Sequence, residues 1–371
     1  MARLAQRGLP RHARYLPDLD WGRFLSLGEG ETPLVESGWF AKALGLKRLY
    51  FKLEHCNPSG SYKDRFVALE LALAAQRGVR RILATSSGNT GASLAAYSAR
   101  YGLECHLFLL EATPAGKLVQ MAAHGAHLHR VRGFGSDPEV TRTIFDRLSA
   151  SAAASGGRLV VSSFRHCPEG MAGVKSIAYE IVEQLGRAPD HTFVPVGGGG
   201  LYSAVVYGYF DVVGKGGALP RVHVVQPALS DTVVHALRSG SASAREVATV
   251  TRISGLGVPV DVDGTRALGL ARACGGEGFL PTDEEILAAQ RDLMRHEGLF
   301  VEPAGAAAVA GLRRAVADGR VGAGDVVVCL LTGHGFKDPA SLGDAENAAD
   351  LIDVAEIPQV VGTAPEGWEG R

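Results

Sequence analysis

The chain is organised around nine consecutive residues, Asn57-Pro58-Ser59-Gly60-Ser61-Tyr62-Lys63-Asp64-Arg65. An alternating, aromatic-rich segment before them, residues 49–54, predicts a strand, and apolar residues at helical spacing after them predict a helix over 64–78. The proline and glycine indicate a bent loop between these elements, and Ser61 is suited to cap the helix. Lys63 therefore stands at a helix start, where its amine could act as a nucleophile toward a carbonyl group. Taken alone, such a lysine is more often a solvated charge, so its role depends on the rest of the chain.

Composition limits the classes of protein that this chain can represent. Its 371 residues suffice for two domains or one large one, and a formal net charge of −1 gives no sign of binding to nucleic acid or to a membrane. Five scattered cysteines without a C-x-x-C spacing indicate reduced thiols in a cytoplasmic protein, with neither a disulfide frame nor a metal site. No apolar run reaches the roughly 18 residues that a membrane helix needs. We expect a cytoplasmic protein with a small-molecule ligand.

Apolar runs alternate with helical patterns along most of the chain, which predicts an α/β fold whose parallel sheets are covered by helices on both faces. Residues 1–27 are expected to form an arm, residues 239–278 irregular structure, and the tail from Pro358 onward a loosely held end. The further predicted strands are 81–85, 105–110, 126–131, 159–162, 191–196, 222–226 and 326–331, and the further predicted helices are 91–101, 114–125, 138–154, 174–185, 201–210, 283–296 and 304–317.

Three loops carry the chemistry that Lys63 would need. The first, Ser86-Ser87-Gly88-Asn89-Thr90-Gly91, joins a predicted strand to a helix. Backbone N–H groups at a helix start bind anions such as a carboxylate, and the Asn89 amide can donate to a phenolate oxygen. An ordinary helix cap and turn would give the same sequence pattern.

The second loop, Pro195-Val196-Gly197-Gly198-Gly199-Gly200-Leu201, also lies between a strand and a helix. Consecutive glycines let the backbone approach a ligand closely, and the helix dipole favours an anion, which together suit a phosphate monoester. The loop lacks the Lys-Ser/Thr pair of a P-loop and the spacing of a dinucleotide fingerprint. A flexible glycine-rich connector is the alternative interpretation.

The third loop, Leu330-Leu331-Thr332-Gly333-His334-Gly335-Phe336-Lys337-Asp338-Pro339, follows an apolar strand, where ligands of open α/β sheets bind. The neutral hydroxyl of Thr332 can hydrogen-bond a pyridine nitrogen without protonating it. The roles of His334 and Lys337 stay open, because either could be a surface residue on a turn.

A reactive amine, an anion loop, a phosphate cup and a neutral hydroxyl together specify a pyridoxal 5′-phosphate site. Over roughly residues 27–340 the chain resembles the fold type II pyridoxal-phosphate enzymes, and most closely the threonine synthases. This resemblance implies a tryptophan synthase β-like α/β fold with two open, twisted, mostly parallel sheets flanked by helices. The residues that carry it are Gly30-Glu31-Thr32-Pro33-Leu34, Asn57 to Arg65, Ser87-Gly88-Asn89-Thr90, Glu302-Pro303-Ala304 and Leu331 to Pro339.

The resemblance also implies residue roles. Lys63 would hold the cofactor covalently and then act as the base for the substrate's Cα proton. The remaining cofactor contacts would come from Asn89, Gly197, Gly198, Gly199, Gly200, Leu201 and Thr332. The substrate would be bound by Ser86, Ser87, Thr90, Lys117 and Arg165.

Two departures from the threonine synthase pattern concern the substrate and the phosphate cup. The glycine loop is closer to that of serine/threonine dehydratases, and the segment Ser163 to Lys175 is longer than the family usually has, which leaves the register of Arg165 open. The expected activity is a lyase of amino-acid biosynthesis that converts O-phospho-L-homoserine and water to L-threonine and phosphate, or acts on a related activated amino acid of specialised metabolism. The alternatives are a serine/threonine dehydratase (ammonia-lyase) giving a 2-oxo acid and a non-catalytic ligand-binding relative.

The predicted architecture has two domains with the cofactor between them. Residues 1–79 and 161–371 would form a large cofactor-binding domain, and residues 80–160 a small mobile domain that closes over the substrate. A homodimer is implied by the resemblance alone, and no metal ion is expected.

Overall fold

The computed structural model describes residues 7–134, 136–213, 217–248, 250–342 and 351–361. Contacts divide the chain into residues 1–338 and 339–371, and the first part contains every described strand. These strands are β1 (Leu34–Glu36), β2 (Arg48–Leu53), β3 (Arg81–Ala84), β4 (Glu104–Leu109), β5 (His127–Arg130), β6 (Arg158–Leu159), β7 (His191–Pro195), β8 (Arg221–Val225), β9 (Gly278–Phe279) and β10 (Val326–Leu331). Its α-helices are α1 (Phe40–Ala43), α2 (Lys63–Gln76), α3 (Asn89–Tyr101), α4 (Val119–Ala123), α5 (Pro138–Ala154), α6 (Pro168–Met171), α7 (Ser176–Leu185), α8 (Gly200–Val213), α9 (Thr232–Ser239), α10 (Gly264–Ala273), α11 (Asp283–Glu297) and α12 (Pro303–Ala317), and the second part contains α13 (Ile357–Val361).

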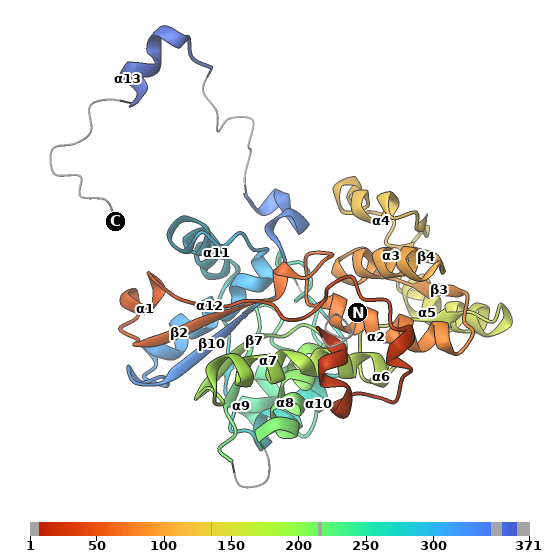
Figure 1. Cartoon of the computed structure of the whole chain (residues 1–371), viewed down its shortest axis with the longest axis horizontal. Helices are drawn as coiled ribbons and strands as arrows, with labels where there is room; N and C mark the ends of the chain where they lie inside the picture. Colours follow the sequence, from red (N-terminus) through yellow and green to blue (C-terminus); the bar gives the residue numbers. More distant parts are fainter. Residues whose placement is uncertain (1–6, 135, 214–216, 249, 343–350, 362–371) are drawn as a thin grey trace. The chain divides into compact units, whose positions relative to one another are not determined.

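Two sheets form the framework. The larger has the order β1-β2-β10-β7-β8-β9, in which β1 is antiparallel to β2 and the other neighbouring pairs are parallel. The smaller has the order β5-β4-β3-β6 and is parallel throughout. Helices flank the sheets, with α12 next to β10 and α3 and α5 next to the smaller sheet (Figure 1). The predicted α/β class with two mostly parallel sheets is confirmed.

The central strands of the larger sheet are buried on both faces, which explains their unbroken apolar sequences. Along β10, Val327 and Cys329 face one hydrophobic cluster with the alanines of α12, whereas Val328 and Leu330 face the other cluster with α2 and α8. This alternation follows from the two-residue period of a strand. A sheet covered on both faces leaves its strand ends as the accessible place for a ligand.

The smaller sheet, from β3 to β6, lies within the predicted segment 80–160, whose status as a separate domain stays a prediction. Leu83 packs against α5 through Ile144 and Leu148, while Leu107 and Leu109 on the opposite face join the main core. The closing motion of this segment stays a prediction.

Three sequence expectations differ from the structure or fall beyond it. The prediction of irregular structure over 239–278 is wrong in part, because α10 forms there and buries Ala267, Leu268 and Ala271 against the core. The expected arm contains two short 3-10 helices and packs through Leu9, which is fully buried. Of the predicted loose tail, residues 362–371 lie outside the described residues. Among the described helices, none is long and apolar enough to cross a membrane.

Candidate active site

The Lys63 loop is joined to the segment after β10 by backbone hydrogen bonds. The Tyr62 N–H donates to the carbonyl oxygen of Thr332 at 3.1 Å, and the His334 N–H donates to that of Gly60 at 2.9 Å. Because β2 and β10 are parallel neighbours, their carboxyl ends meet at one edge of the sheet. The lysine and the threonine predicted for the cofactor are therefore brought together by the sheet itself.

The buried carboxylate of Asp64 holds this loop in position. Asp64 is fully buried and accepts hydrogen bonds from the Ser59 N–H at 2.6 Å and from the Ser93 hydroxyl of α3 at 2.6 Å. Burial raises the pKa of Asp64, and its hydrogen bonds oppose that shift. The predicted helix cap is wrong: the N-cap position of α2 is Tyr62, and the buried Ser61 hydroxyl has no hydrogen-bond partner among the described residues. The loop is therefore held by the carboxylate of Asp64 and not by a Ser61 cap.

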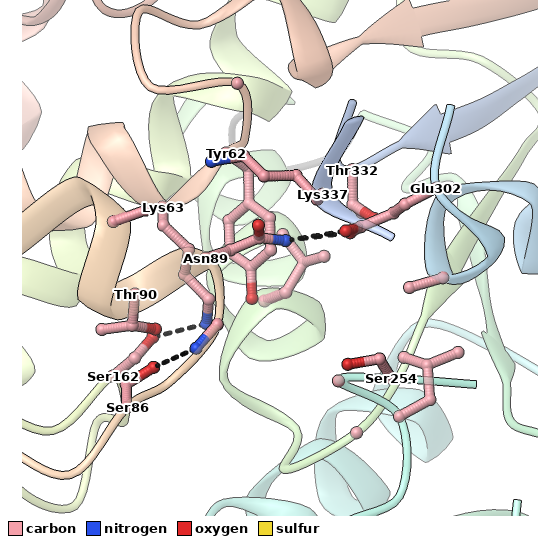
Figure 2. Close-up of a pocket in the computed structure, with 18 of the residues that line it drawn as sticks. Tyr62, Lys63, Ser86, Asn89, Thr90, Ser162, Ser254, Glu302, Thr332 and Lys337 are labelled. Carbon is pink, nitrogen blue, oxygen red and sulfur yellow. Dashed lines mark hydrogen bonds between the residues drawn. The ribbon is translucent and has the colours of Figure 1, made fainter. Parts of the chain in front are cut away.

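Lys63 points into a cavity of about 1100 Å³. Its Nζ donates to the hydroxyl of Ser162 at 2.7 Å and lies 4.6 Å from the centre of the Tyr62 ring (Figure 2). The cavity lining includes Lys63 together with the predicted residues Ser86, Ser87, Asn89, Thr90, Lys117, Gly197, Gly198, Gly199, Gly200, Leu201 and Thr332. Ser162 was not predicted, because no local pattern links it to a lysine 99 residues earlier.

The glycine loop has the geometry of an anion cup. Gly199 has φ +95°, and a Cβ there would lie 2.6 Å from the carbonyl oxygen of Asp263; a Cβ on Gly197 would lie 2.5 Å from that of Gly255. Only glycine fits these two positions. Among the described residues, none accepts a backbone hydrogen bond from the N–H groups of Gly197, Gly198 or Gly199. These donors sit next to the start of α8, an arrangement that suits a phosphate.

Asn89 is held by an acid that the sequence analysis did not assign to the site. Its Nδ2 donates to Oε1 and Oε2 of Glu302, at 2.9 and 3.1 Å (Figure 2). Glu302 precedes α12 and is 7% exposed, and burial raises its pKa to about 7 against the opposing effects of Asn89 and Lys337. A Cβ on Gly333 would lie 2.2 Å from Glu302 Oε1, so this glycine makes room for the acid. The only sign of this acid's place in the site that the sequence offers is the pair Glu302-Pro303 at the start of a predicted helix.

The serine-rich loop lies between β3 and α3 on another side of the cavity. The Ser86 hydroxyl accepts hydrogen bonds from the backbone N–H groups of Gly91 and Gly88, at 3.2 and 3.3 Å. A Cβ on Gly91 would lie 2.1 Å from the Ser86 carbonyl oxygen, so the turn requires glycine there. The start of a 13-residue helix therefore faces the cavity, as an anion-binding loop requires.

Two further lysines line the cavity. Lys117 Nζ donates to the Ser254 hydroxyl at 2.9 Å, and Lys337 Nζ donates to Gln120 Oε1 at 2.5 Å. Burial lowers the pKa of Lys337, while the nearby carboxyl groups of Asp64 and Glu302 raise it. The site thus carries two amines besides Lys63.

Arg165 is placed differently. Its side chain is exposed, and the described cavity lining does not include it. Its backbone N–H donates to Asp263 Oδ1 at 3.2 Å, and that of Phe164 donates to Oδ2 at 2.7 Å. The extra length of this segment is held against the Asp263 loop, so we do not include Arg165 in the site.

Comparison with known proteins identifies the family. A family model described as pyridoxal-phosphate dependent enzyme matches residues 25–333. The chain belongs to this family. Lys63, the glycine loop and Thr332 line one cavity, and the N–H groups of the glycine loop that have no backbone acceptor among the described residues fit a phosphate group.

The enzyme is similar in sequence to several threonine synthases. It is 37% identical to that of Methanocaldococcus jannaschii over 90% of this chain and 81% of the relative, and 36% identical to that of Halalkalibacterium halodurans over 89% of both. Similar solved structures include a threonine deaminase of Solanum lycopersicum, with TM-score 0.70 and 19% identity over 90% of this chain and 82% of the other. A maize serine racemase gives TM-score 0.69 and 20% identity over 97% and 95%. These structures support the fold type II architecture.

Proposed function

We propose that the enzyme is a threonine-synthase-like lyase that converts O-phospho-L-homoserine and water to L-threonine and phosphate. The observation that carries the proposal is the pair of cavity lysines, Lys117 and Lys337, in addition to the cofactor lysine. A phosphate ester carries close to two negative charges at neutral pH, and lysine ammonium groups are common phosphate ligands. The threonine synthase relatives at 36–37% identity support the same reaction.

The chain's own groups divide the work of the proposed reaction. Bound pyridoxal phosphate supplies an electron sink for negative charge at the substrate's Cα. The Lys63 amine would accept the Cα proton, and Ser162 would hold that amine in position through the 2.7 Å hydrogen bond. Ser86, Ser87 and Thr90 would bind the substrate carboxylate beside the start of α3. Lys117 and Lys337 would bind the phosphate and stabilise it as it leaves.

The second candidate is a serine/threonine dehydratase that releases ammonia and a 2-oxo acid. The four-glycine cup favours it, and threonine deaminases are among the structures with this fold. A dehydratase acting on unphosphorylated amino acids has no use for two extra cations next to the substrate. The lysine pair therefore favours the phosphorylated substrate.

One assay separates these candidates. Holoenzyme is incubated with O-phospho-L-homoserine, and separately with L-threonine and L-serine, and phosphate, threonine and 2-oxo acid are measured. Phosphate and threonine in equal amounts from the first substrate support the proposal. A 2-oxo acid from unphosphorylated threonine supports the dehydratase. Turnover of neither contradicts both and directs the search to another activated amino acid of specialised metabolism.

The proposal includes a homodimer in the cytoplasm and closure of residues 80–160 over the substrate. The five scattered cysteines without a C-x-x-C spacing support a reducing compartment. Sedimentation equilibrium tests the dimer. Protection of the segment 80–160 from hydrogen exchange when substrate analogue is added tests the closure.

A further inference from the structure

Three histidines and a glutamate gather on the smaller sheet. His106 on β4 is the direct partner of His127 on the parallel strand β5, and His129 lies two residues further along β5. Residues two apart on a strand share a face, so His127 and His129 point to the same side of the sheet. Glu104 and His106 share that side on β4, while Cys105 and Leu107 are buried on the other side. This cluster is not part of the cavity that holds Lys63.

Glu104, His106 and His127 offer one possible ligand atom each, and these three atoms lie within 4.8 Å of one another. His106 Nδ1 lies 3.2 Å from His129 Nε2, which is a hydrogen-bond distance. The His106 ring stacks on both neighbours, with centroid distances of 4.7 Å to His127 and 5.4 Å to His129.

Glu104 and His129 contact the two ring nitrogens of the central imidazole. Glu104 Oε1 lies 2.8 Å from His106 Nε2, and Arg81 donates to the other Glu104 oxygen at 2.8 Å. If the Nδ1 proton of His106 is donated to His129, the lone pair of His106 is on Nε2, the nitrogen that faces Glu104. Metal-bound imidazoles are usually fixed in this way by a hydrogen bond from the other ring nitrogen.

We propose that Glu104, His106 and His127 bind one divalent transition-metal ion, with Zn²⁺ as the representative ion and His129 as the outer partner of His106. Imidazole nitrogens with one carboxylate select ions of the zinc, nickel and copper class over magnesium and calcium, which take oxygen ligands. The ion would link β4 to β5 on the outer face of the smaller sheet. This site is independent of the proposed reaction.

The test uses untagged full-length holoenzyme, because a polyhistidine tag would bind the same ions. Zn²⁺ is titrated calorimetrically, and Co²⁺ replaces it so that its visible spectrum reports ligand type and geometry. We expect one ion per chain, a tetrahedral Co²⁺ spectrum without thiolate bands, and a higher thermal midpoint with Zn²⁺. The variants His106→Gln and His129→Ala should weaken binding by at least about tenfold, since even removal of an orienting partner costs about 10–100-fold.

The control is His124→Ala, an exposed histidine three residues before His127 and outside the cluster. It should bind Zn²⁺ like the unmodified enzyme. Unchanged urea midpoints of the metal-free variants show that the sheet is intact. Absence of saturable binding, equal binding by the His106→Gln and control variants, or thiolate bands in the Co²⁺ spectrum would each overturn the proposal.

Discussion

Asn89 Nδ2 lies 2.9 Å from Oε1 of Glu302, an acid 213 residues away whose buried carboxyl group lines the same cavity as Lys63. The contact joins the start of α3, which follows the smaller sheet's strand β3, to the start of α12 on the larger one. If Asn89 contacts the cofactor as proposed, the orientation of its amide depends on Glu302. The protonation state of this acid then matters to both stability and cofactor binding.

Glu302→Gln should change how stability depends on pH. The folded-state pKa of about 7 is above the ordinary value of about 4.3, so Glu302 favours the folded state below pH 4 and this contribution is lost as pH rises to 7. Glutamine keeps an acceptor for Asn89 and cannot ionise. In urea unfolding of cofactor-free protein, the variant should gain about 1–3 kcal/mol relative to the unmodified chain between pH 5 and pH 8. A difference between the two that is independent of pH would contradict the buried acid's role.

Lys63→Ala tests the covalent role of the central lysine. Borohydride reduction of the holoenzyme should attach the cofactor at Lys63 alone, because its amine lies in the cavity between Ser162 and Tyr62. The variant should trap none and lose the visible absorbance of the bound cofactor. Peptide mapping is the measurement, and Lys117 and Lys337 are the built-in comparison, since both amines line the same cavity. Trapping at either of them in the variant would defeat the assignment.

The local geometry of the candidate site could largely be predicted from sequence because its signals are local. The strand, the glycines 197–200 and the following helix are adjacent in the chain, and only glycine satisfies the backbone of Gly199. The contact between Asn89 and Glu302 could not be predicted, because it depends on how the two sheets are brought together. The same holds for Lys337 and its partner Gln120, and for the exposed Arg165, whose position is set by packing of a lengthened segment on Asp263.

Lys337→Gln should lower kcat/KM for O-phospho-L-homoserine by about 10–100-fold, since one charge-assisted hydrogen bond is worth about 1.5–3 kcal/mol. Loss of Lys117 should act in the same direction. Turnover of an unphosphorylated amino acid, where it is detectable, should change little. The control is Lys42→Gln on the exposed face of α1. If Lys337→Gln impairs both kinds of substrate equally, then Lys337 supports the structure of the Gly60 loop and does not select the phosphate.

Gly199→Ala should damage the phosphate cup, and Gly198→Ala should not. At Gly199 the backbone has φ +95° and a Cβ would meet the Asp263 carbonyl oxygen at 2.6 Å, so alanine forces the loop to move. At Gly198 the nearest atom to an added Cβ is Val262 Cβ at 3.6 Å, which is ordinary contact. We expect Gly199→Ala to lose at least about 1–3 kcal/mol in urea unfolding, the range for strained backbone, and to weaken cofactor binding by more than about tenfold.

The two measurements separate the loop's role in folding from its role in phosphate binding. Cofactor titration followed by visible absorbance should give the same affinity for Gly198→Ala as for the unmodified chain. Because alanine keeps its backbone N–H, the control leaves the donors of the cup in place. If both variants bind the cofactor normally, the phosphate is held elsewhere and the free N–H groups of the glycine loop have another function.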